Sequence, residues 1–203
     1  MEKELSKNEV EILNLFRKNL FIKKTIREIS LILKKHYPRT YDSVKNLERK
    51  EILKIKKIGN SNVCEINLSQ KTISSLSYLD EQEAIDLNIP NLKKVVDFKE
   101  FFDDIIIVTG SYAIGKQTKK SDIDLVIITK ENAFNKQKLL ENLSISFIPE
   151  IHPIIFTHKD FVNMLLNNEE NFGKEVFNNH LLFRNSARYY LLIKEAIQHG
   201  FNN

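Results

Sequence analysis

The 203-residue sequence is 42% hydrophobic and 29% charged, the composition of an ordinary globular protein, with a net charge of +4 at pH 7. It has no apolar run long enough to cross a bilayer, it opens on charged residues where a secretory signal would be apolar, and no Cys/His pair has zinc-ligand spacing. The single cysteine, Cys64, excludes an internal disulfide, so we expect a cytoplasmic protein.

The charge is distributed unevenly along the chain. Residues 1–70 hold 16 Lys and Arg against 9 Asp and Glu, a net charge of +7, whereas residues 71–203 hold 15 against 18, a net charge of −3. A basic N-terminal third is expected when only one domain contacts nucleic acid. The alternative is that the chain is simply rich in lysine throughout.

Two capping boxes, Ser6-x-x-Glu9 and Thr25-x-x-Glu28, predict two helix starts in the N-terminal third. Apolar residues follow each of them at helical spacing: Val10, Leu13, Phe16 and Leu20 after the first, and Ile26, Ile29, Ile32 and Leu33 after the second. We expect Pro38 to close the second helix, because the residue before a proline avoids the α region.

A third helix is predicted next, with Tyr41, Val44 and Leu47 on its inner face. Its outward positions would be Thr40, Asp42, Ser43, Lys45, Asn46 and Arg49. Residues 52–58 and 63–68 then read as strands joined by the polar turn 59–62. Three helices and a hairpin over roughly residues 5–68 resemble a winged helix-turn-helix.

In DNA-binding proteins of that class the third helix enters the major groove, and Lys and Arg contact phosphates. By this resemblance the predicted nucleic-acid-binding residues are Arg39, Lys45, Asn46, Arg49, Lys56 and Lys57. The alternative is a winged helix used for dimerisation or for docking a protein partner.

The charge sign changes after residue 70, and residues 71–91 lack glycine while apolar residues persist. We therefore expect a connecting helix, with Asp80, Glu81 and Glu83 in its first turn. The predicted organisation is a winged helix domain at 1–70, a connecting helix at 71–91 and a second domain at 92–203.

The second domain is expected to begin with a helix through Leu92, Val95, Val96, Lys99 and Phe102. The β-branched run 105–108 then reads as a buried strand, and a second strand begins at Asp122. Asp122 and Asp124 share a face of that strand because side chains alternate, which brings two like charges close enough to share a cation. Mg²⁺ suits such a pair, because it binds a few carboxylates together with phosphate oxygens.

Gly110 and Ser111 follow the first of these strands, where glycine lets backbone approach a ligand and free N–H groups favour phosphate. The segment Gly110-Ser111-x-Ala113-x-Gly115, followed by Ser121-Asp122-x-Asp124-Leu125, resembles the signature of the polymerase-beta-like nucleotidyltransferase superfamily, especially its minimal members. The resemblance implies an α/β (α+β) fold with a small mixed sheet, a nucleoside triphosphate donor and two Mg²⁺ ions. It implies these nucleotide-binding residues: Gly110, Ser111, Gly115, Lys120 and Ser121.

The resemblance also implies a third metal-binding carboxylate on a later strand, next to the metal-binding and catalytic pair Asp122 and Asp124. We expect that strand at 149–157, where Glu150 and His152 share a face. Glu150 is the candidate, although counting back from the strand end places His152 where minimal members usually carry Asp. His152 could instead be an ordinary, partly buried strand histidine.

Residues 160–166 read as a helix, 172–183 are ambiguous, and 186–198 form a C-terminal helix whose Tyr189 and Tyr190 we assign to the core. The sequence thus predicts a Mg²⁺-dependent enzyme that moves a nucleoside monophosphate, from ATP by preference, to a protein hydroxyl, a nucleic-acid end or a small molecule. The alternatives are a DNA-binding regulator or antitoxin whose transferase-like domain only binds nucleotide, and an interaction module without either activity.

Overall fold

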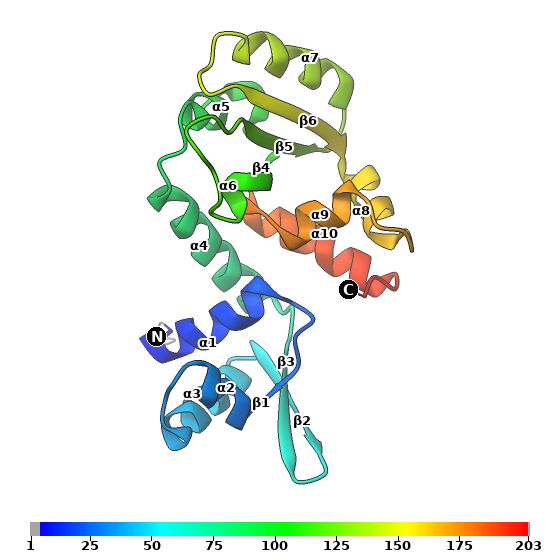
Figure 1. Ribbon diagram of the computed structural model, residues 1–203. Coiled ribbons are helices and arrows are strands. Elements are labelled where there is room, and N and C mark those ends of the chain that lie inside the picture. Colours follow the sequence, from blue (N-terminus) through cyan, green and yellow to red (C-terminus); the bar gives the residue numbers. More distant parts are fainter. Residues whose placement is uncertain (1–4, 203) are drawn as a thin grey trace. The chain divides into compact units, whose positions relative to one another are not determined.

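The computed structural model describes residues 5–202, so residues 1–4, whose charge enters the prediction against a secretory signal, lie outside it. The chain divides into two compact units, the first reaching Leu76 and the second spanning Ser77–Phe201. Figure 1 shows both units, and each is described by itself. Within the described range no helix is long and apolar enough to span a membrane.

Between residues 5 and 69, the first unit contains three helices and an antiparallel sheet with the strand order β1-β3-β2. Its elements are α1 (Lys7–Lys18), β1 (Lys24–Thr25), α2 (Ile26–Ile32), α3 (Tyr37–Arg49), β2 (Leu53–Ile58) and β3 (Ser61–Ile66). Helices followed by a β-hairpin, in this order, confirm the predicted winged helix fold.

Both predicted capping boxes form. The Ser6 side chain accepts from the Glu9 N–H, and the Glu9 carboxylate accepts from the Ser6 N–H at 2.6 Å; Thr25 and Glu28 make the same reciprocal pair. These bonds satisfy donors that the first turn of a helix leaves free, which explains why α1 and α2 begin where they do.

The structure corrects three details of this region. Pro38 lies in the first turn of α3, where its missing N–H costs nothing, and α2 ends earlier, before Lys34 with its φ of 52°. Thr40 and Ser43, expected to point outward, are buried with Val44 and Leu47, because positions i, i+3, i+4 and i+7 share one helix face. Ile32, expected to be inside, is 48% exposed.

The predicted connecting helix exists as α4 (Gln70–Asp86), and the division between the two units falls within it. Asp80, Glu81 and Glu83 do not lie in its first turn, because the helix begins at Gln70, ten residues before Asp80. The Asp80 carboxylate is instead buried and accepts a hydrogen bond from the Tyr190 hydroxyl. Its role is to satisfy a buried phenol, and not to complement a helix dipole.

The second unit is built on a mixed four-stranded sheet with the order β6-β5-β4-β7, in which β5 and β6 are parallel and the other pairs antiparallel. Its elements are α5 (Leu92–Val96), the 3₁₀ helix η1 (Lys99–Phe101), β4 (Ile105–Val108), α6 (Gly110–Ala113), β5 (Ile123–Thr129), α7 (Ala133–Ser144), β6 (Ile151–Thr157), α8 (His158–Leu166), α9 (Phe172–Asn178), β7 (Leu181–Arg184) and α10 (Ser186–Gln198). The predicted small mixed sheet is confirmed.

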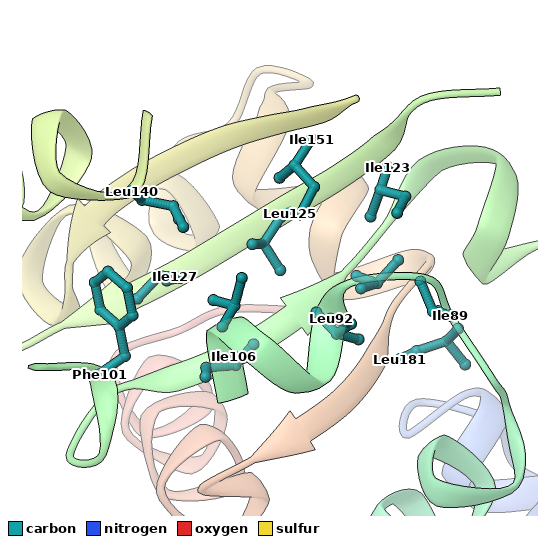
Figure 2. Packing of buried hydrophobic residues seen from close by; sticks show 12 residues of the cluster. Ile89, Leu92, Phe101, Ile106, Ile123, Leu125, Ile127, Leu140, Ile151 and Leu181 are labelled. Atoms are coloured by element: carbon teal, nitrogen blue, oxygen red, sulfur yellow. The ribbon is translucent and has the colours of Figure 1, made fainter. Parts of the chain in front are cut away.

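Both faces of this sheet are covered, which explains the unbroken apolar runs in β4 and β5. One face carries the cluster of Figure 2, in which Ile106, Leu125 and Ile127 pack with Leu92 and Phe101 from α5 and η1 and with Leu140 from α7. The alternate strand residues are equally buried, and α8 and α10 contact the strands from the other side. Tyr189 and Tyr190 of α10 are core residues, as predicted.

In three segments of the second unit, the secondary structure differs from the prediction or falls where the sequence supports no clear prediction. The expected helix at 92–102 is broken into α5 and η1, so that Phe101 is buried and Phe102 is 46% exposed. The ambiguous stretch 172–183 resolves into α9 and β7, and α7 had no sequence-based prediction. Gln137 of α7 joins the backbone of β6 by donating to the Pro153 carbonyl at 2.7 Å and accepting from the Ile155 N–H at 2.9 Å, which protects an edge strand.

Candidate functional site

The parallel pair β5–β6 places four polar side chains at the same end of the sheet. Ile123 pairs with Ile151 and Asp124 with His152, and the Ile123 N–H donates to the Glu150 carbonyl at 2.9 Å. Asp122 therefore lies at the level of Glu150, and Asp124 lies at the level of His152, two residues further along both strands. The expected second and third strands are adjacent.

Gly110 brings the turn after β4 against one of the aspartates. Its φ of +64° is in the left-handed region, and a Cβ built on it would lie 2.0 Å from Asp124 Oδ2. The adjacent Thr109 N–H donates to the Asp124 carbonyl at 2.9 Å, and the Thr109 hydroxyl donates to the Asn179 carbonyl at 2.6 Å. Glycine is required at this position, both for its backbone angle and for the space that the carboxylate occupies.

The remaining residues predicted to bind nucleotide lie on α6 and in the loop after it. Ser111 is half-buried in the single turn of α6, and Gly115, with a φ of +68°, has nothing within 4 Å of an added Cβ. Ser121 closes a local turn, because its hydroxyl accepts from the Thr118 N–H at 2.9 Å. Lys120 is exposed in the same turn. The loop is thus ordered by its own hydrogen bonds and carries its lysines outward.

His152 lies between two carboxylates. Its Nε2 is 3.8 Å from Asp122 Oδ2 and 3.8 Å from Glu150 Oε1, and the His152 side chain is 52% exposed. This half exposure is also compatible with the alternative raised by the sequence, an ordinary, partly buried strand histidine. Glu150 is more open still, at 72%. This end of the sheet is accessible to a ligand and dense in groups that bind cations.

The aspartates fit a divalent cation that is shared with a substrate. Neither carboxylate forms an ion pair with a Lys or Arg among residues 5–202, and the close approach of Gly110 fixes one of them. Within the same range no group of three or more His, Cys, Asp and Glu side chains is gathered tightly enough to hold a metal alone. The protein therefore offers an incomplete ligand set, which phosphate oxygens would complete.

The predicted nucleic-acid-binding residues lie on α3 and β2 of the first unit. Lys45 pairs with Glu48 at 2.7 Å, Lys56 pairs with Glu65 at 2.6 Å, and the Arg49 guanidinium donates to the Asn46 side chain. Arg39 and Lys57 are exposed. All of them remain reachable from solvent, but several already have partners on their own helix or hairpin.

Sequence reasoning missed a groove in this unit. It has a volume of about 720 Å³ and lies between α2, the turn into α3 and the turn between β2 and β3. Its polar walls include Arg27, Lys35, His36 and the hairpin residues 60–62. These residues come from separate segments with no common spacing, so no sequence pattern could have indicated that they line one groove.

Comparison with known proteins gives a family match and weak structural similarity. Residues 89–177, just under half of the chain, match the family model of the nucleotidyltransferase domain. No curated protein sequence matches the chain. Among solved structures, MepR, a transcription regulator of the Staphylococcus aureus multidrug efflux pump MepA, is 16% identical with a TM-score of 0.36, over 45% of this chain and 73% of MepR. A mutant of ZitR from Lactococcus lactis is 15% identical with a TM-score of 0.35, over 49% of this chain and 66% of ZitR.

Proposed function

We propose that the second unit transfers a nucleoside monophosphate from a nucleoside triphosphate, ATP in the first instance, to an acceptor hydroxyl, as a minimal member of the polymerase-beta-like superfamily. The observation that carries the proposal is the contact of the Gly110 turn with Asp124, beside Asp122. This contact brings the turn that we expect to bind phosphate and the pair of carboxylates to one end of the sheet. The family match over residues 89–177 supports the same reaction class.

In this proposal Asp122 and Asp124 hold the donor-side Mg²⁺ together with the triphosphate. When bound, the ion would neutralise phosphate oxygens and so favour attack of the acceptor hydroxyl on the α-phosphorus, with loss of the hydroxyl proton to water and departure of pyrophosphate. Backbone at Gly110 and the hydroxyl of Ser111 orient the triphosphate, with Gly115, Lys120 and Ser121 in the adjoining loop. A second ion would need a third protein ligand from β6, where Glu150 and His152 are both available.

The solvent exposure of the site determines which kinds of acceptor can reach it. Asp122, Glu150 and His152 are all about half exposed or more, so nothing within the described part of this unit buries the acceptor side. A macromolecular acceptor, such as a hydroxyl of a protein partner, can approach such a surface. A nucleic-acid end and a small molecule are the other candidate acceptors, and the transfer assay should include both.

The test is transfer of label from ATP radiolabelled at the α-phosphate, in the presence of Mg²⁺, to candidate acceptors or to the chain itself. We expect covalent label with wild type and none with Asp122→Asn/Asp124→Asn. Binding of ATP without transfer to any acceptor class would favour the alternative of a regulator that only senses nucleotide. Equal labelling by the double variant would contradict the proposal.

We also propose that the first unit binds duplex nucleic acid, because residues 1–70 carry a net charge of +7 and the groove places Arg27 and His36 beside the polar hairpin turn. The log of the affinity of the full chain for a labelled duplex should then fall linearly with the log of salt concentration. Arg49→Glu with Lys56→Glu tests α3 and β2, and Arg27→Glu tests the groove. No retention of duplex by wild type at low salt would leave the unit as a protein interaction module.

A further inference from the structure

The groove of the first unit gathers basic side chains without a carboxylate to oppose them. Its lining residues, all within the described range, include Arg27, Lys35 and His36 and no Asp or Glu. Lys35 is already bound by Glu11 and Asn8. The exposed side chains of Arg27 and His36 have no hydrogen bond or ion pair with any of residues 5–202. Arg27 and His36 are therefore available to an anion such as a phosphate.

The carboxylate next to Arg27 in the sequence does not cancel this charge. Glu28 is committed to the capping box of α2, where it accepts from the Thr25 N–H at 2.7 Å, and it lies 3.7 Å from the Lys24 ammonium. Its negative charge is therefore balanced by Lys24, and the charge of Arg27 remains for a ligand.

Two apolar side chains line the same groove while they remain open to water. Leu31 is 69% exposed and Tyr37 is 46% exposed. The Tyr37 ring packs near that of Tyr41, with 6.2 Å between the ring centroids, and this contact restricts its orientation. An aromatic face held in this way suits a planar ligand, because stacking on an aromatic side chain stabilises a nucleic-acid base of any identity.

The turn between β2 and β3 adds hydrogen-bonding groups to the groove. Asn60, Ser61 and Asn62 all line it, and none of these three described residues is buried. A side-chain amide both donates and accepts hydrogen bonds, as the edge of a base requires. The volume of about 720 Å³ lies in the range of small-molecule sites, about 300–1,000 Å³.

We infer that this groove binds an unpaired nucleotide, with the base stacked on Tyr37 and the phosphate bound by Arg27 and His36. The nucleotide can belong to a single strand or be free in solution. A duplex cannot use the Tyr37 face, because its bases are paired and stacked on one another. An acidic peptide would match the basic groups but would leave the aromatic face without a counterpart. The inference goes beyond the proposed duplex binding, because it assigns a base as well as a phosphate to the groove.

The test compares two labelled single strands of equal length: oligothymidylate, and an abasic oligomer that carries the same phosphates without bases. Binding to the full chain is measured in EDTA, which removes the Mg²⁺ on which the proposed nucleotide site of the second unit depends. We expect wild type to bind oligothymidylate about tenfold more tightly than the abasic oligomer, since stacking of a base on an aromatic side chain contributes about that much.

Substitutions locate this discrimination in the groove. Tyr37→Ala should lower the affinity for oligothymidylate to that for the abasic oligomer, whereas Tyr37→Phe keeps the aromatic face and should retain the difference. Tyr78→Ala is the matched control, because Tyr78 is 64% exposed on α4, outside the groove, and it should change neither affinity. Arg27→Gln should weaken binding of both oligomers and reduce the slope of log affinity against log salt by about 0.7, the value for one phosphate of a single strand. Circular dichroism verifies the fold of each variant.

Unlabelled competitors identify the source of the nucleotide. Displacement of the label by thymidine monophosphate, as effective as by oligothymidylate at the same nucleotide concentration, would assign the groove to a free nucleotide. Displacement by oligothymidylate alone would assign it to a single strand. Either result supports the inference.

Four results would overturn it. Wild type could bind the two oligomers equally, or Tyr37→Ala could still discriminate between them. Polyglutamate could displace the label as well as oligothymidylate does, which would make the groove a site for an acidic protein segment. Binding of duplex and of no single strand would overturn the inference and leave the proposed duplex binding standing, whereas failure to bind either would overturn both.

Discussion

The two units use charged side chains in opposite ways. In the first unit, lysines are matched with carboxylates of neighbouring elements: Lys50 with Glu9, and Lys56 with Glu65. At the end of β5, by contrast, Asp122 and Asp124 share a strand face, and within residues 5–202 only a histidine ring approaches as a counterpart. Charges in the first unit hold elements in place, whereas those at the sheet end are like charges that repel one another.

The second unit also shows that its carboxylates can be neutralised where structure requires it. Asp104 is buried and forms an ion pair with Lys136 of α7. Within residues 5–202, the same unit therefore pairs a buried aspartate but leaves the exposed Asp122 and the half-buried Asp124 without a lysine or arginine partner. This difference distinguishes a structural carboxylate from one that is available to a ligand.

The largest effect should come from Gly110→Ala. The new methyl group collides with the Asp124 carboxylate and also forces an L-residue to a φ of +64°. We expect the free energy of unfolding to fall by about 2–4 kcal/mol and nucleotide binding to be lost, since overpacking and backbone strain add. Chemical denaturation and nucleotide titration measure the two effects.

Gly115→Ala is the matched control for that change. Gly115 has a similar φ of +68°, but an added Cβ would meet nothing within 4 Å. It should therefore cost only the backbone strain, about 1–2 kcal/mol. If the two alanine variants lose the same stability and retain the same affinity for nucleotide, the contact between the Gly110 turn and Asp124 is unimportant.

A smaller effect is expected at Glu9, the buried carboxylate of the first unit. Burial alone would raise the pKa of Glu9, but hydrogen bonds from Ser6 and Lys50 more than offset it, so the pKa lies below its usual value. Glu9→Gln should lower the free energy of unfolding by about 1–3 kcal/mol near pH 7. Glu11, on the same helix as Glu9, is a partly exposed partner of Lys35, so Glu11→Gln is the control and should change the free energy of unfolding little.

The pH dependence of this contribution has a definite sign. Because the pKa of Glu9 is lower in the folded chain than in the unfolded chain, its stabilisation is fully present above the unfolded value. It is lost as the pH falls through the folded value. The difference in unfolding free energy between wild type and Glu9→Gln should therefore shrink in acid, and a constant difference would contradict the assignment.

The smallest effect is expected from the exposed pairs of α3 and β2. Lys45→Ala and Lys56→Ala each break a surface ion pair, and such pairs contribute about 0–1 kcal/mol. Neither should shift the melting temperature by more than a few degrees. A large loss of stability would show that these lysines have a structural role that is incompatible with their proposed contact to nucleic acid.

Local signals predicted the fold well where they are strong. The capping boxes, the buried run of β4 and the helix at Ser186–Gln198 could all be read from hydrogen-bonding and apolar patterns. Helix α7 could not, because its apolar residues are irregularly spaced and Gln137 acts through the backbone of β6. Asp80 was misplaced because an acidic cluster is as compatible with a buried hydrogen bond as with a helix start.

The candidate site could be predicted only in part. Alternation along one strand was enough to put Asp122 and Asp124 on one face, but contacts between separate segments carry no local signal. The approach of Gly110 to Asp124 and the position of His152 between two carboxylates depend on strand register, which the sequence does not encode locally. The groove beside Arg27 is also lined by residues from separate segments, so the sequence gives no local signal for it either.

The most direct test of the central claim is calorimetric titration of the full chain with Mg²⁺-ATP. Asp122→Asn/Asp124→Asn removes the pair of like charges while preserving shape. We expect wild type to bind and to lose binding in EDTA, and the double variant to bind at least about tenfold more weakly. Its melting temperature should stay the same or rise, since repulsion is relieved. Undiminished affinity in the double variant would contradict the assignment of this sheet end as the nucleotide and metal site.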